Sequence, residues 1–522
     1  MRNQLSLFLM ALLLVLAGCA SLPTEVVRPV AAHTDRDTEP SRIATYAAPY
    51  LSEHVGKSGF WLLGDGLDAY AARLMLVEAA DRTIDVQYYL YHDDVTGRIL
   101  TYRLLRAADR GVRVRLLLDD MTTKGNDAAL ASLDAHPNIE VRAINPFANR
   151  NLRGLETLTR FDTVTRRMHN KSFTVDNLMT IVGGRNIGDE YFDTHDKVNF
   201  SDLDVLAMGP AAAKVGGQFD LYWNSDLAYP MRALVDTRTE LAQLRTDLKD
   251  HDVAQRNSPY IRRARSSDLV RDFIAGTLDF QWGQALVFYD LPEKLVTDPE
   301  DRSTHMAPKL LPLTLGSLKR DLLIFNPYFV PGQNGVLMLT DLEKRGVQVR
   351  VLTNSLASTD VGAVHAGYAK YRKPLLRAGA EIYEFKPGAD SAERGKFAKL
   401  TGSSGASLHA KTAVLDQEAL FVGSANFDPR SGKLNTELGI LFQSEPLAKG
   451  LNDWFDENQA RIAYRVSLDT AHCAGQQPCQ KRLRWIDEQD GRETVYVRDP
   501  ETGALTRFFV ALIALLPIEG QL

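Results

Sequence analysis

Cysteine is scarce in this chain, with three residues among 522. Cys19 closes an amino-terminal apolar run, which leaves Cys473 and Cys479 as a closely spaced pair. An even pair in an exported chain predicts one local disulfide. His472 lies beside Cys473, but two cysteines and one histidine make no standard zinc spacing, so the sequence predicts no metal site there.

Net positive charge is absent as well, because the formal charge is −5 at pH 7. A chain without an excess of lysine and arginine lacks the field that draws proteins to nucleic acid, so no nucleic-acid partner is expected. The sequence also has no P-loop, GxSxG elbow, HExxH pair or evident Rossmann fingerprint. These absences argue against the common nucleotide-binding, serine-nucleophile and zinc-hydrolase sites.

No apolar run is long enough to span a bilayer comfortably. The run over residues 5–17 follows Arg2 and is bounded by small residues. A basic residue followed by a short apolar stretch is typical of a signal peptide, which we expect to cover residues 1–18.

The run ends in Leu16-Ala17-Gly18-Cys19, which is similar to a bacterial lipobox. In that interpretation Cys19 is lipidated and becomes the first residue of the mature chain. Ala20 follows the cysteine in place of aspartate, which favours the outer membrane by analogy with enteric bacteria. We therefore expect a lipid-anchored, periplasm-facing protein of the bacterial cell envelope, with residues 19–55 as a tether.

What the chain does contain is one sparse pattern in two copies. Within each copy, lysine follows histidine by two residues, aspartate by seven and asparagine by seventeen. The first copy is His169, Lys171, Asp176, Gly183-Gly184 and Asn186, and the second is His409, Lys411, Asp416, Gly423-Ser424 and Asn426. A single such pattern is usually noise, whereas two complete copies with identical offsets indicate a shared function.

The spacing within each copy suits a β-hairpin. An apolar stretch follows each lysine, and on a strand residues i and i+2 share a face, so histidine and lysine project together. A second apolar stretch after a polar break returns each asparagine towards its histidine. Asp176 and Asp416 lie at odd offsets, so we interpret them as supports of the strand end rather than as groups that touch substrate.

The duplication extends beyond the motifs, since the phrase at residues 110–117 reappears at residues 345–352. Each half is predicted as strand, helix, strand and a later hairpin, which indicates an α/β fold with sheets covered by helices. The expected organisation is signal peptide 1–18, tether 19–55, first half 56–235, connecting segment 236–268, second half 269–462 and C-terminal extension 463–522.

These residues resemble the phospholipase D superfamily, whose hallmark is a duplicated HxKxxxxD followed by G-[GS]-x-N. The wider phrases RMHNKSFTVDN and LHAKTAVLD look like its cardiolipin synthase branch, nearest the C type. The resemblance implies two pseudo-symmetric halves, each a mixed sheet flanked by helices, with one active site at their interface. It also implies phosphatidyl transfer between phospholipids, with phosphatidylethanolamine as donor and phosphatidylglycerol as acceptor, and no cofactor or metal.

The resemblance suggests His169 as nucleophile and His409 as general acid and base, although the residues alone do not order them. Lys171, Lys411, Asn186 and Asn426 would hold the phosphoryl oxygens. Asp202 and Glu437 follow the two motifs at similar positions, and each could hold the far ring nitrogen of its histidine or simply be a surface charge.

Two other functions are compatible with the sequence, one that uses the motif histidines in catalysis and one that does not. A phospholipase D that transfers to water, or less readily a nuclease, would need the same histidines. A non-catalytic lipid-binding envelope protein is a third possibility, although both motifs are intact.

Overall fold

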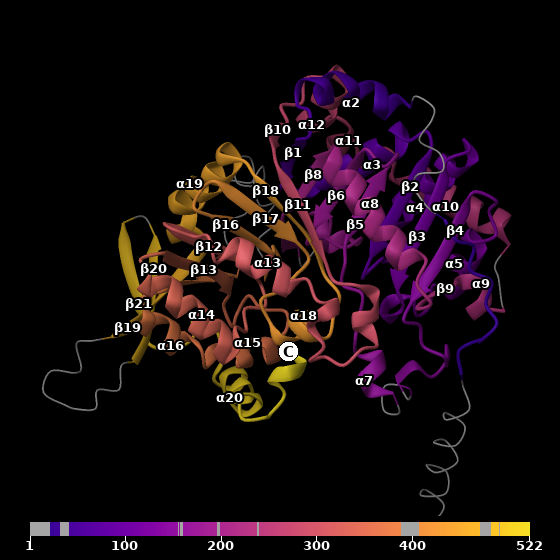
Figure 1. The fold of residues 1–522 in the computed structure, drawn as a ribbon. Helices are drawn as coiled ribbons and strands as arrows, with labels where there is room; N and C mark the ends of the chain where they lie inside the picture. The colour runs from indigo at the N-terminus through magenta and orange to yellow at the C-terminus, as the bar shows by residue number, and fades with distance from the viewer. Residues whose placement is uncertain are drawn as a thin grey trace, which may run out of the picture.

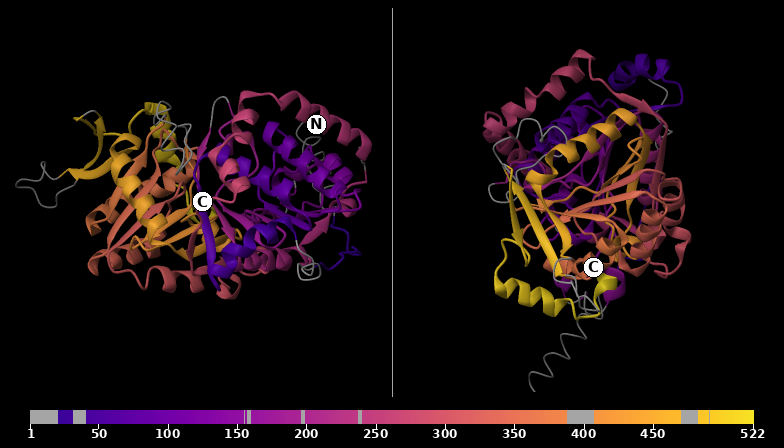
Figure 2. Two further views of the ribbon diagram at one scale, coloured as in Figure 1. Left: turned by 90° about the horizontal axis from the view of Figure 1, so that it is seen from above. Right: turned by 90° about the vertical axis from the view of Figure 1, so that its left-hand side faces the viewer.

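The computed structural model describes every residue except 1–20, 32–40, 155, 157–159, 196–198, 237–239, 388–406, 470–481 and 490. Cys19, Cys473 and Cys479 fall in these gaps, so the lipid anchor and the disulfide stay predictions. Two α/β halves lie side by side, and the C-terminus lies at their junction (Figures 1 and 2). The predicted fold class is therefore confirmed.

The first half is built on a nine-stranded mixed sheet. Strands β2, β3 and β4 are parallel to one another, and β5 and β6 form an antiparallel hairpin beside them. In order across the sheet the strands are β10 (Gln281–Gly283), β1 (Ser58–Leu63), β8 (Asp204–Met208), β6 (Met179–Gly183), β5 (Ser172–Val175), β2 (Thr83–Tyr88), β3 (Arg113–Asp119), β4 (Ile139–Ile144) and β9 (Ala228–Pro230).

The second half repeats this order in a ten-stranded sheet, with β12, β13 and β14 parallel and β16–β17 as the hairpin. Strands after residue 462 extend this sheet at its far edge. Across the sheet the strands are β11 (Ala285–Tyr289), β18 (Leu438–Gln443), β17 (Ala419–Gly423), β16 (Thr412–Leu415), β12 (Asp321–Phe325), β13 (Gln348–Asn354), β14 (Glu381–Phe385), β19 (Ala463–Asp469), β20 (Arg482–Gln489) and β21 (Arg492–Tyr496).

Helices cover both sheets, and α10, α11 and α12 pack on the outer helices α3 and α4 of the first half. No described helix is both long and apolar enough to cross a membrane. The α-helices are α2 (Arg42–Glu53), α3 (Gly66–Ala79), α4 (Val95–Asp109), α5 (Asp127–Leu133), α7 (Phe161–Val164), α8 (Pro210–Trp223), α9 (Met231–Leu234), α10 (Leu241–Gln255), α11 (Pro259–Arg265), α12 (Asp268–Ala275), α13 (Ala307–Thr314), α14 (Gly332–Lys344), α15 (Gly362–Ala369), α16 (Arg372–Ala378), α18 (Pro429–Lys433), α19 (Glu445–Ile462) and α20 (Ala504–Ile513). Short 3₁₀ turns are η2 (Asp120–Thr122), η3 (Asp189–Tyr191), η4 (Pro292–Leu295), η5 (Arg302–Thr304) and η7 (Glu519–Gln521).

The two halves share one apolar core between their sheets. Strand β6 of the first half lies against β17 and β18 of the second. Phe60 stacks on Phe442 across this contact, with ring centroids 4.1 Å apart, and both side chains are fully buried. Because this core continues from one sheet to the other, the two motif hairpins are held in a fixed relation at the interface.

A small parallel pair of strands also crosses the interface. Strand β7 (Phe200–Ser201) of the first half pairs with β15 (Ser407–Leu408) of the second. Met168 and Thr436 form an isolated parallel bridge at the corresponding place on the other side. Through these two crossings, the residue that follows Ser201 and the residue that follows Thr436 each come next to the motif histidine of the opposite half.

Candidate active site

Both motif histidines lie at the start of their hairpins, where the halves meet. His169 precedes β5 by three residues and His409 directly follows β15. Their side chains are largely enclosed, since His169 is 8% and His409 6% exposed, and Lys171 and Lys411 are 1% exposed. Burial is the largest cause that lowers the pKa of both histidines, and the charges of Lys171 and Lys411 lower each of them further, so each lysine acts on both histidines. The four basic groups therefore form a single site.

Each histidine is held by a carboxylate of the opposite half. His169 Nδ1 lies 3.0 Å from Glu437 Oε2, and His409 Nδ1 lies 2.6 Å from Asp202 Oδ2. The sequence-based interpretation paired each acid with the histidine of its own half, and that pairing is wrong. The β7–β15 pair carries Asp202 to His409, and the Met168–Thr436 bridge carries Glu437 to His169.

A carboxylate acceptor at Nδ1 places the ring hydrogen on that nitrogen and leaves Nε2 for the reacting group. The two acids themselves differ. Burial would raise the pKa of Glu437, but the nearby charges of His169 and Lys171 and the hydrogen bonds from His169 and Ser424 lower it. Burial raises the pKa of Asp202, although Lys411 and Arg185 oppose this rise.

The position after the hairpin glycine explains part of this difference. Ser424 Oγ donates to Glu437 Oε2 at 2.5 Å, and Ser431 Oγ donates to Glu437 Oε1 at 2.7 Å. The equivalent residue in the first half is Gly184, and a Cβ there would lie 2.2 Å from Asp202 Oδ1. Glycine is therefore required beside Asp202, whereas serine stabilises the charge on Glu437.

Both lysines turn back onto their own hairpins. Lys171 Nζ donates to the His169 carbonyl oxygen at 2.6 Å, and Lys411 Nζ donates to that of His409 at 2.5 Å. Burial lowers the pKa of Lys171 to about 7 and that of Lys411 to about 8, against the opposing charges of Glu437 and Asp202. Burial likewise lowers the pKa of His169 to about 4. Such a site favours an anion, which would restore the charge on these bases.

The two motif asparagines differ in their contacts. Asn186 Oδ1 accepts from Leu90 N at 3.2 Å, and its Nδ2 donates to Tyr191 Oη at 2.9 Å. Asn426 Oδ1 is buried and has no hydrogen-bond partner within the described part of the chain. Asn186 is thus held by its own half, while Asn426 keeps unused hydrogen-bonding capacity.

Comparison with known proteins agrees with this arrangement. The family described as "Cardiolipin synthase, PLD-like domain" matches residues 74–223 and 314–458, one segment in each half. Cardiolipin synthase C of Escherichia coli (strain K12) is 42% identical over 92% of this chain and 100% of its own length. The chain belongs to the phospholipase D-like cardiolipin synthase family.

More distant relatives give a consistent result. An uncharacterized protein of Helicobacter pylori (strain ATCC 700392 / 26695) is 34% identical over 81% of this chain and 84% of its own. Cardiolipin synthase A of Pseudomonas entomophila (strain L48) is 28% identical over 78% of this chain and 71% of its own. The crystal structure of phosphatidylserine synthase from Haemophilus influenzae Rd KW20 has the same fold, with a TM-score of 0.54 and 13% identity over 81% of this chain and 91% of that one.

In this family member the motif aspartates lie at the far end of each first hairpin strand from its histidine. Asp176 accepts the backbone N–H groups of residues 81–83 at 3.2, 2.9 and 3.0 Å. Asp416 accepts those of residues 319–321 at 3.0, 2.7 and 3.0 Å. Both have positive φ, +49° and +51°, at the turn between the hairpin strands. These contacts join the hairpin to the neighbouring strand.

Sequence reasoning missed a second pair of supports. Asp119 Oδ2 accepts Met168 N at 2.9 Å, and Asn354 Oδ1 accepts Leu408 N at 2.9 Å. Asp119 and Asn354 end β3 and β13, and each fixes the residue before a motif histidine. They are 235 residues apart, the offset of the repeated phrase at residues 110–117, so the repeat register was the signal that could have found them.

Aromatic rings line the site beside the histidines. The ring of Tyr89 lies 5.2 Å from that of His169, and the rings of Phe200 and Tyr191 lie 5.0 and 5.4 Å from that of His409.

One described group of side chains has metal-ligand character, namely His92, Asp94 and Glu190, and none of them belongs to the two motifs.

Proposed function

We propose that this chain is a phosphatidyltransferase that makes cardiolipin from phospholipids through a phosphohistidine intermediate. The observation that carries the proposal is the pair of buried histidines, each with a carboxylate of the other half on Nδ1, between two buried lysines. Similarity to a cardiolipin synthase over 92% of the chain supports the same conclusion.

In the first step His169 Nε2 attacks the phosphorus of the donor lipid. A P–N bond forms, the P–O bond to the headgroup alcohol breaks, and His409 gives its proton to the departing oxygen. Glu437, whose pKa is lowered, offsets the positive charge that develops on the His169 ring. This is why we assign His169 as the nucleophile.

In the second step His409 takes the proton of an acceptor hydroxyl, the acceptor oxygen attacks phosphorus, and the P–N bond breaks. His409 must be protonated when the donor is bound, although in the empty site burial and Lys411 lower its pKa. A phosphodiester beside it adds negative charge and raises that pKa. Substrate binding therefore prepares the general acid.

Lys171, Lys411, Asn186 and Asn426 would hold the phosphoryl oxygens and offset the charge that builds there. The motifs supply these groups without a carboxylate cluster of the kind that binds catalytic divalent ions. We accordingly propose a reaction that needs no metal and no cofactor. Asp202 and Glu437 would act as positioning residues, and Asp176 and Asp416 as supports of the hairpins.

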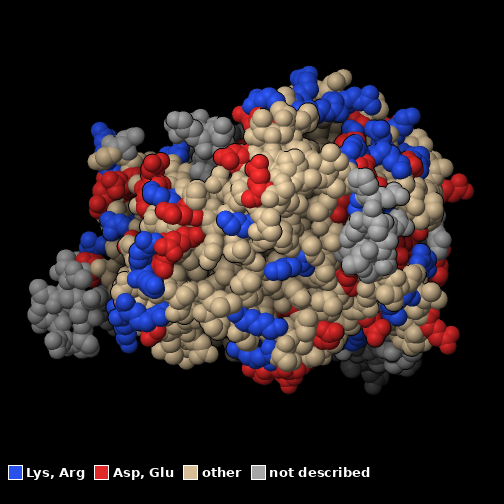
Figure 3. Space-filling view, turned by 45° about the horizontal axis from the view of Figure 1, so that its top comes forward, with Lys and Arg blue, Asp and Glu red and all other residues tan. Residues whose placement is uncertain are grey.

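The proposed donor is phosphatidylethanolamine and the proposed acceptor is phosphatidylglycerol. The formal net charge of −5 leaves the chain without an overall basic field, which favours a lipid over a nucleic-acid substrate. On the face in Figure 3, acidic and basic side chains intermingle.

We further propose that Cys19 is lipidated and holds the protein, facing the periplasm, at the outer membrane. The Leu16–Cys19 lipobox supports this. Membranes labelled with a radioactive fatty acid should yield a labelled protein, and Cys19→Ser should abolish the label. A labelled Cys19→Ser protein would contradict the assignment.

Lipid mass spectrometry provides the test of the reaction. Purified protein is incubated with phosphatidylethanolamine and phosphatidylglycerol in excess EDTA, with His169→Ala as control. Cardiolipin and free ethanolamine should appear only with the active protein. Phosphatidic acid without cardiolipin would replace the proposal with hydrolysis, and a requirement for magnesium or calcium on a soluble short-chain substrate would contradict the two-histidine mechanism.

A further inference from the structure

A cavity of about 640 Å³ lies beneath the second sheet, on the face covered by α13 and α14. One end includes Lys411 and Asn426 of the candidate active site. Side chains of the sheet and of α13 form an apolar wall that includes Leu310, Leu315, Ile324, Ala413, Leu415 and Phe421, and the charged residues Asp290, Lys294, Arg302, Asp428, Lys433 and Glu519 also line the cavity. The cavity therefore places an apolar wall beside a phosphate-binding group.

Within the described part of the first half, the position beneath the hairpin that corresponds to Ala413 holds a larger side chain. By strand register Ala413 corresponds to Phe173, since Ala413 pairs with Ile324 as Phe173 pairs with Val86. Phe173 is fully buried and pairs with Ile181, whereas Ala413 is partly buried, pairs with Phe421 and lines the cavity.

The helix that covers the sheet is also smaller in the second half than in the first. In the first half α3 has 14 residues, nine of them buried, between β1 and β2. Its counterpart α13, between β11 and β12, has 8 residues, and only Leu310 and Thr314 are buried. A shorter helix with an internal proline, Pro312, leaves the sheet beneath it partly uncovered.

The C-terminal residues form part of the cavity wall. Glu519 and Gly520 line it, and the carbonyl oxygen of Leu522 accepts from Arg430 N at 2.9 Å, next to the second motif. The preceding helix, α20, has no buried residue, and its Phe508 and Phe509 are 62% and 52% exposed. The C-terminal segment thus combines a part of the cavity wall with an exposed apolar helix.

We propose that this cavity binds one acyl chain of the phospholipid whose phosphate lies at the histidines. The inference rests on the proposed function and adds to it a site for the lipid tail. The volume falls within the roughly 300–1,000 Å³ of pockets that enclose small ligands. An apolar wall of sheet and α13 side chains next to Lys411 matches an amphiphile with a hydrocarbon tail and a charged head.

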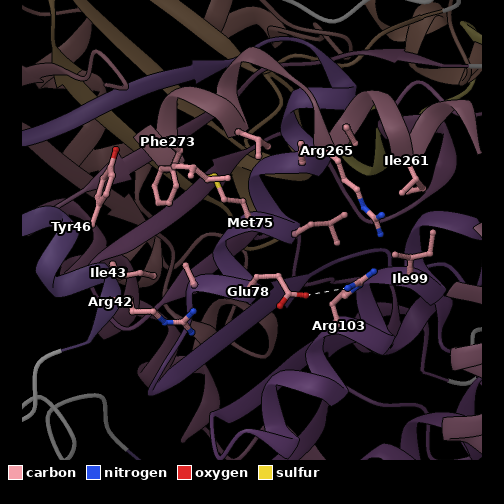
Figure 4. Close-up of a pocket in the computed structure, with 16 residues that line it drawn as sticks. Arg42, Ile43, Tyr46, Met75, Glu78, Ile99, Arg103, Ile261, Arg265 and Phe273 are labelled. Atoms are coloured by element: carbon pink, nitrogen blue, oxygen red, sulfur yellow. Dashed lines mark hydrogen bonds and ion pairs between the residues drawn. The ribbon is translucent and has the colours of Figure 1, made fainter. Parts of the chain in front are cut away.

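A second apolar pocket offers a matched control. It has about 540 Å³, lies among α2, α3, α11 and α12, and contains no residue of either motif (Figure 4). Arg42, Arg103 and Met75 are among the side chains that line it. A tryptophan placed in this pocket changes apolar packing without approaching the histidines.

The test compares turnover of dioleoyl- and dihexanoyl-phosphatidylethanolamine, both in the same mixed detergent micelles, by release of ethanolamine. Ala413→Phe inserts the residue that the first half already accommodates, and Leu311→Trp fills the cavity from α13. Each should lower the ratio of long-chain to short-chain turnover by about tenfold or more, because burial of about two methylenes accounts for such a factor. Met75→Trp should leave the ratio at its wild-type value.

An unchanged ratio in a folded Ala413→Phe or Leu311→Trp protein would overturn the proposal, and so would an equal fall in the Met75→Trp control. Headgroup release precedes the choice of acceptor, so the ratio is independent of whether the product is cardiolipin or phosphatidic acid. Failure of the cavity is thereby distinguished from failure of the synthase assignment.

Discussion

The two halves of this protein share one plan and depart from it at specific points. Each places a histidine and a lysine at the start of a hairpin, and each supports that hairpin with an aspartate. They differ in the acid on the histidine, with glutamate on His169 and aspartate on His409, and in the packing behind the hairpin. In the proposed reaction, the halves are alike in the lysines that would hold the phosphate and differ in the groups that would act on it in different ways.

The acids that hold the two histidines also differ in the direction of their pKa shifts. Two serines donate to Glu437, whose pKa is lowered, while the pKa of Asp202 is raised by burial. In the second half Lys411 Nζ also lies 3.1 Å from His409 Nδ1, and burial together with this charge lowers the pKa of His409. Burial lowers the pKa of His169 as well, so the difference between the halves lies in the two acids. In the proposed reaction His169 becomes cationic during attack and His409 supplies the proton.

Loss of either histidine should have the largest effect. His169→Ala and His409→Ala should each lower turnover by about 10³-fold or more, because the nucleophile or the proton donor is lost. Both lie at an interface cleft, so apparent melting temperatures should stay near that of the wild type. Headgroup release and differential scanning fluorimetry provide the two readouts, and substantial activity in either variant would remove the two-histidine mechanism.

Substitution of the two acids should have the next largest effect, and the loss of kcat should differ between them. Glu437→Gln should lower kcat by about 10²–10⁴-fold, because an amide neither offsets the ring charge nor fixes the Nδ1–H tautomer. Asp202→Asn should cost about tenfold, because burial raises the pKa of Asp202, so this acid holds its proton more tightly and offsets less ring charge than Glu437 does. KM should change little in either, which a purely structural defect would not reproduce. Equal losses in kcat would remove the assigned difference between the halves.

The lowered pKa values of the two lysines predict an upper pH limit for the activity of the free enzyme. With pKa values of about 7 for Lys171 and about 8 for Lys411, both lose their charge as pH rises through this range. Consequently kcat/KM for a soluble substrate should fall as pH rises above about 7, while kcat falls only at higher pH because bound phosphate raises both pKa values. A kcat/KM that stays constant up to about pH 10, where ordinary lysines titrate, would contradict the lowered pKa values.

The bracing aspartates should affect stability unequally. Asp176 is 1% exposed, whereas Asp416 is half-buried and two of its N–H partners are exposed. Asp176→Ala should cost about 3 kcal/mol of stability and Asp416→Ala about 1 kcal/mol, because orphaned donors cost more when buried. Thermal melting of the two variants shows which of them loses more stability. A normal melting temperature with complete loss of activity in Asp176→Ala would show that this carboxylate acts on substrate instead.

Much of this architecture was predictable from spacing alone. The two-residue offset between histidine and lysine, followed by paired apolar stretches, predicted both hairpins and their common site. The exchange of acids between halves was not predictable, because it depends on the β7–β15 pair, two strands of two residues each without a sequence signal. The cavity was not predictable either, because Ala413, which corresponds to Phe173 of the first copy, lies beneath the short helix α13, and only the structure brings the two together.

The division of labour between the halves is tested most directly by locating the covalent intermediate. His409→Ala and His169→Ala are each incubated with a phosphatidyl ester of p-nitrophenol, whose leaving group needs no general acid. The reactions are quenched in alkaline detergent, which preserves the P–N bond, and the peptides are analysed by mass spectrometry. The phosphatidyl group should be found on the His169 peptide of His409→Ala and be absent from His169→Ala. An adduct on His409, or none on either histidine, would contradict the account.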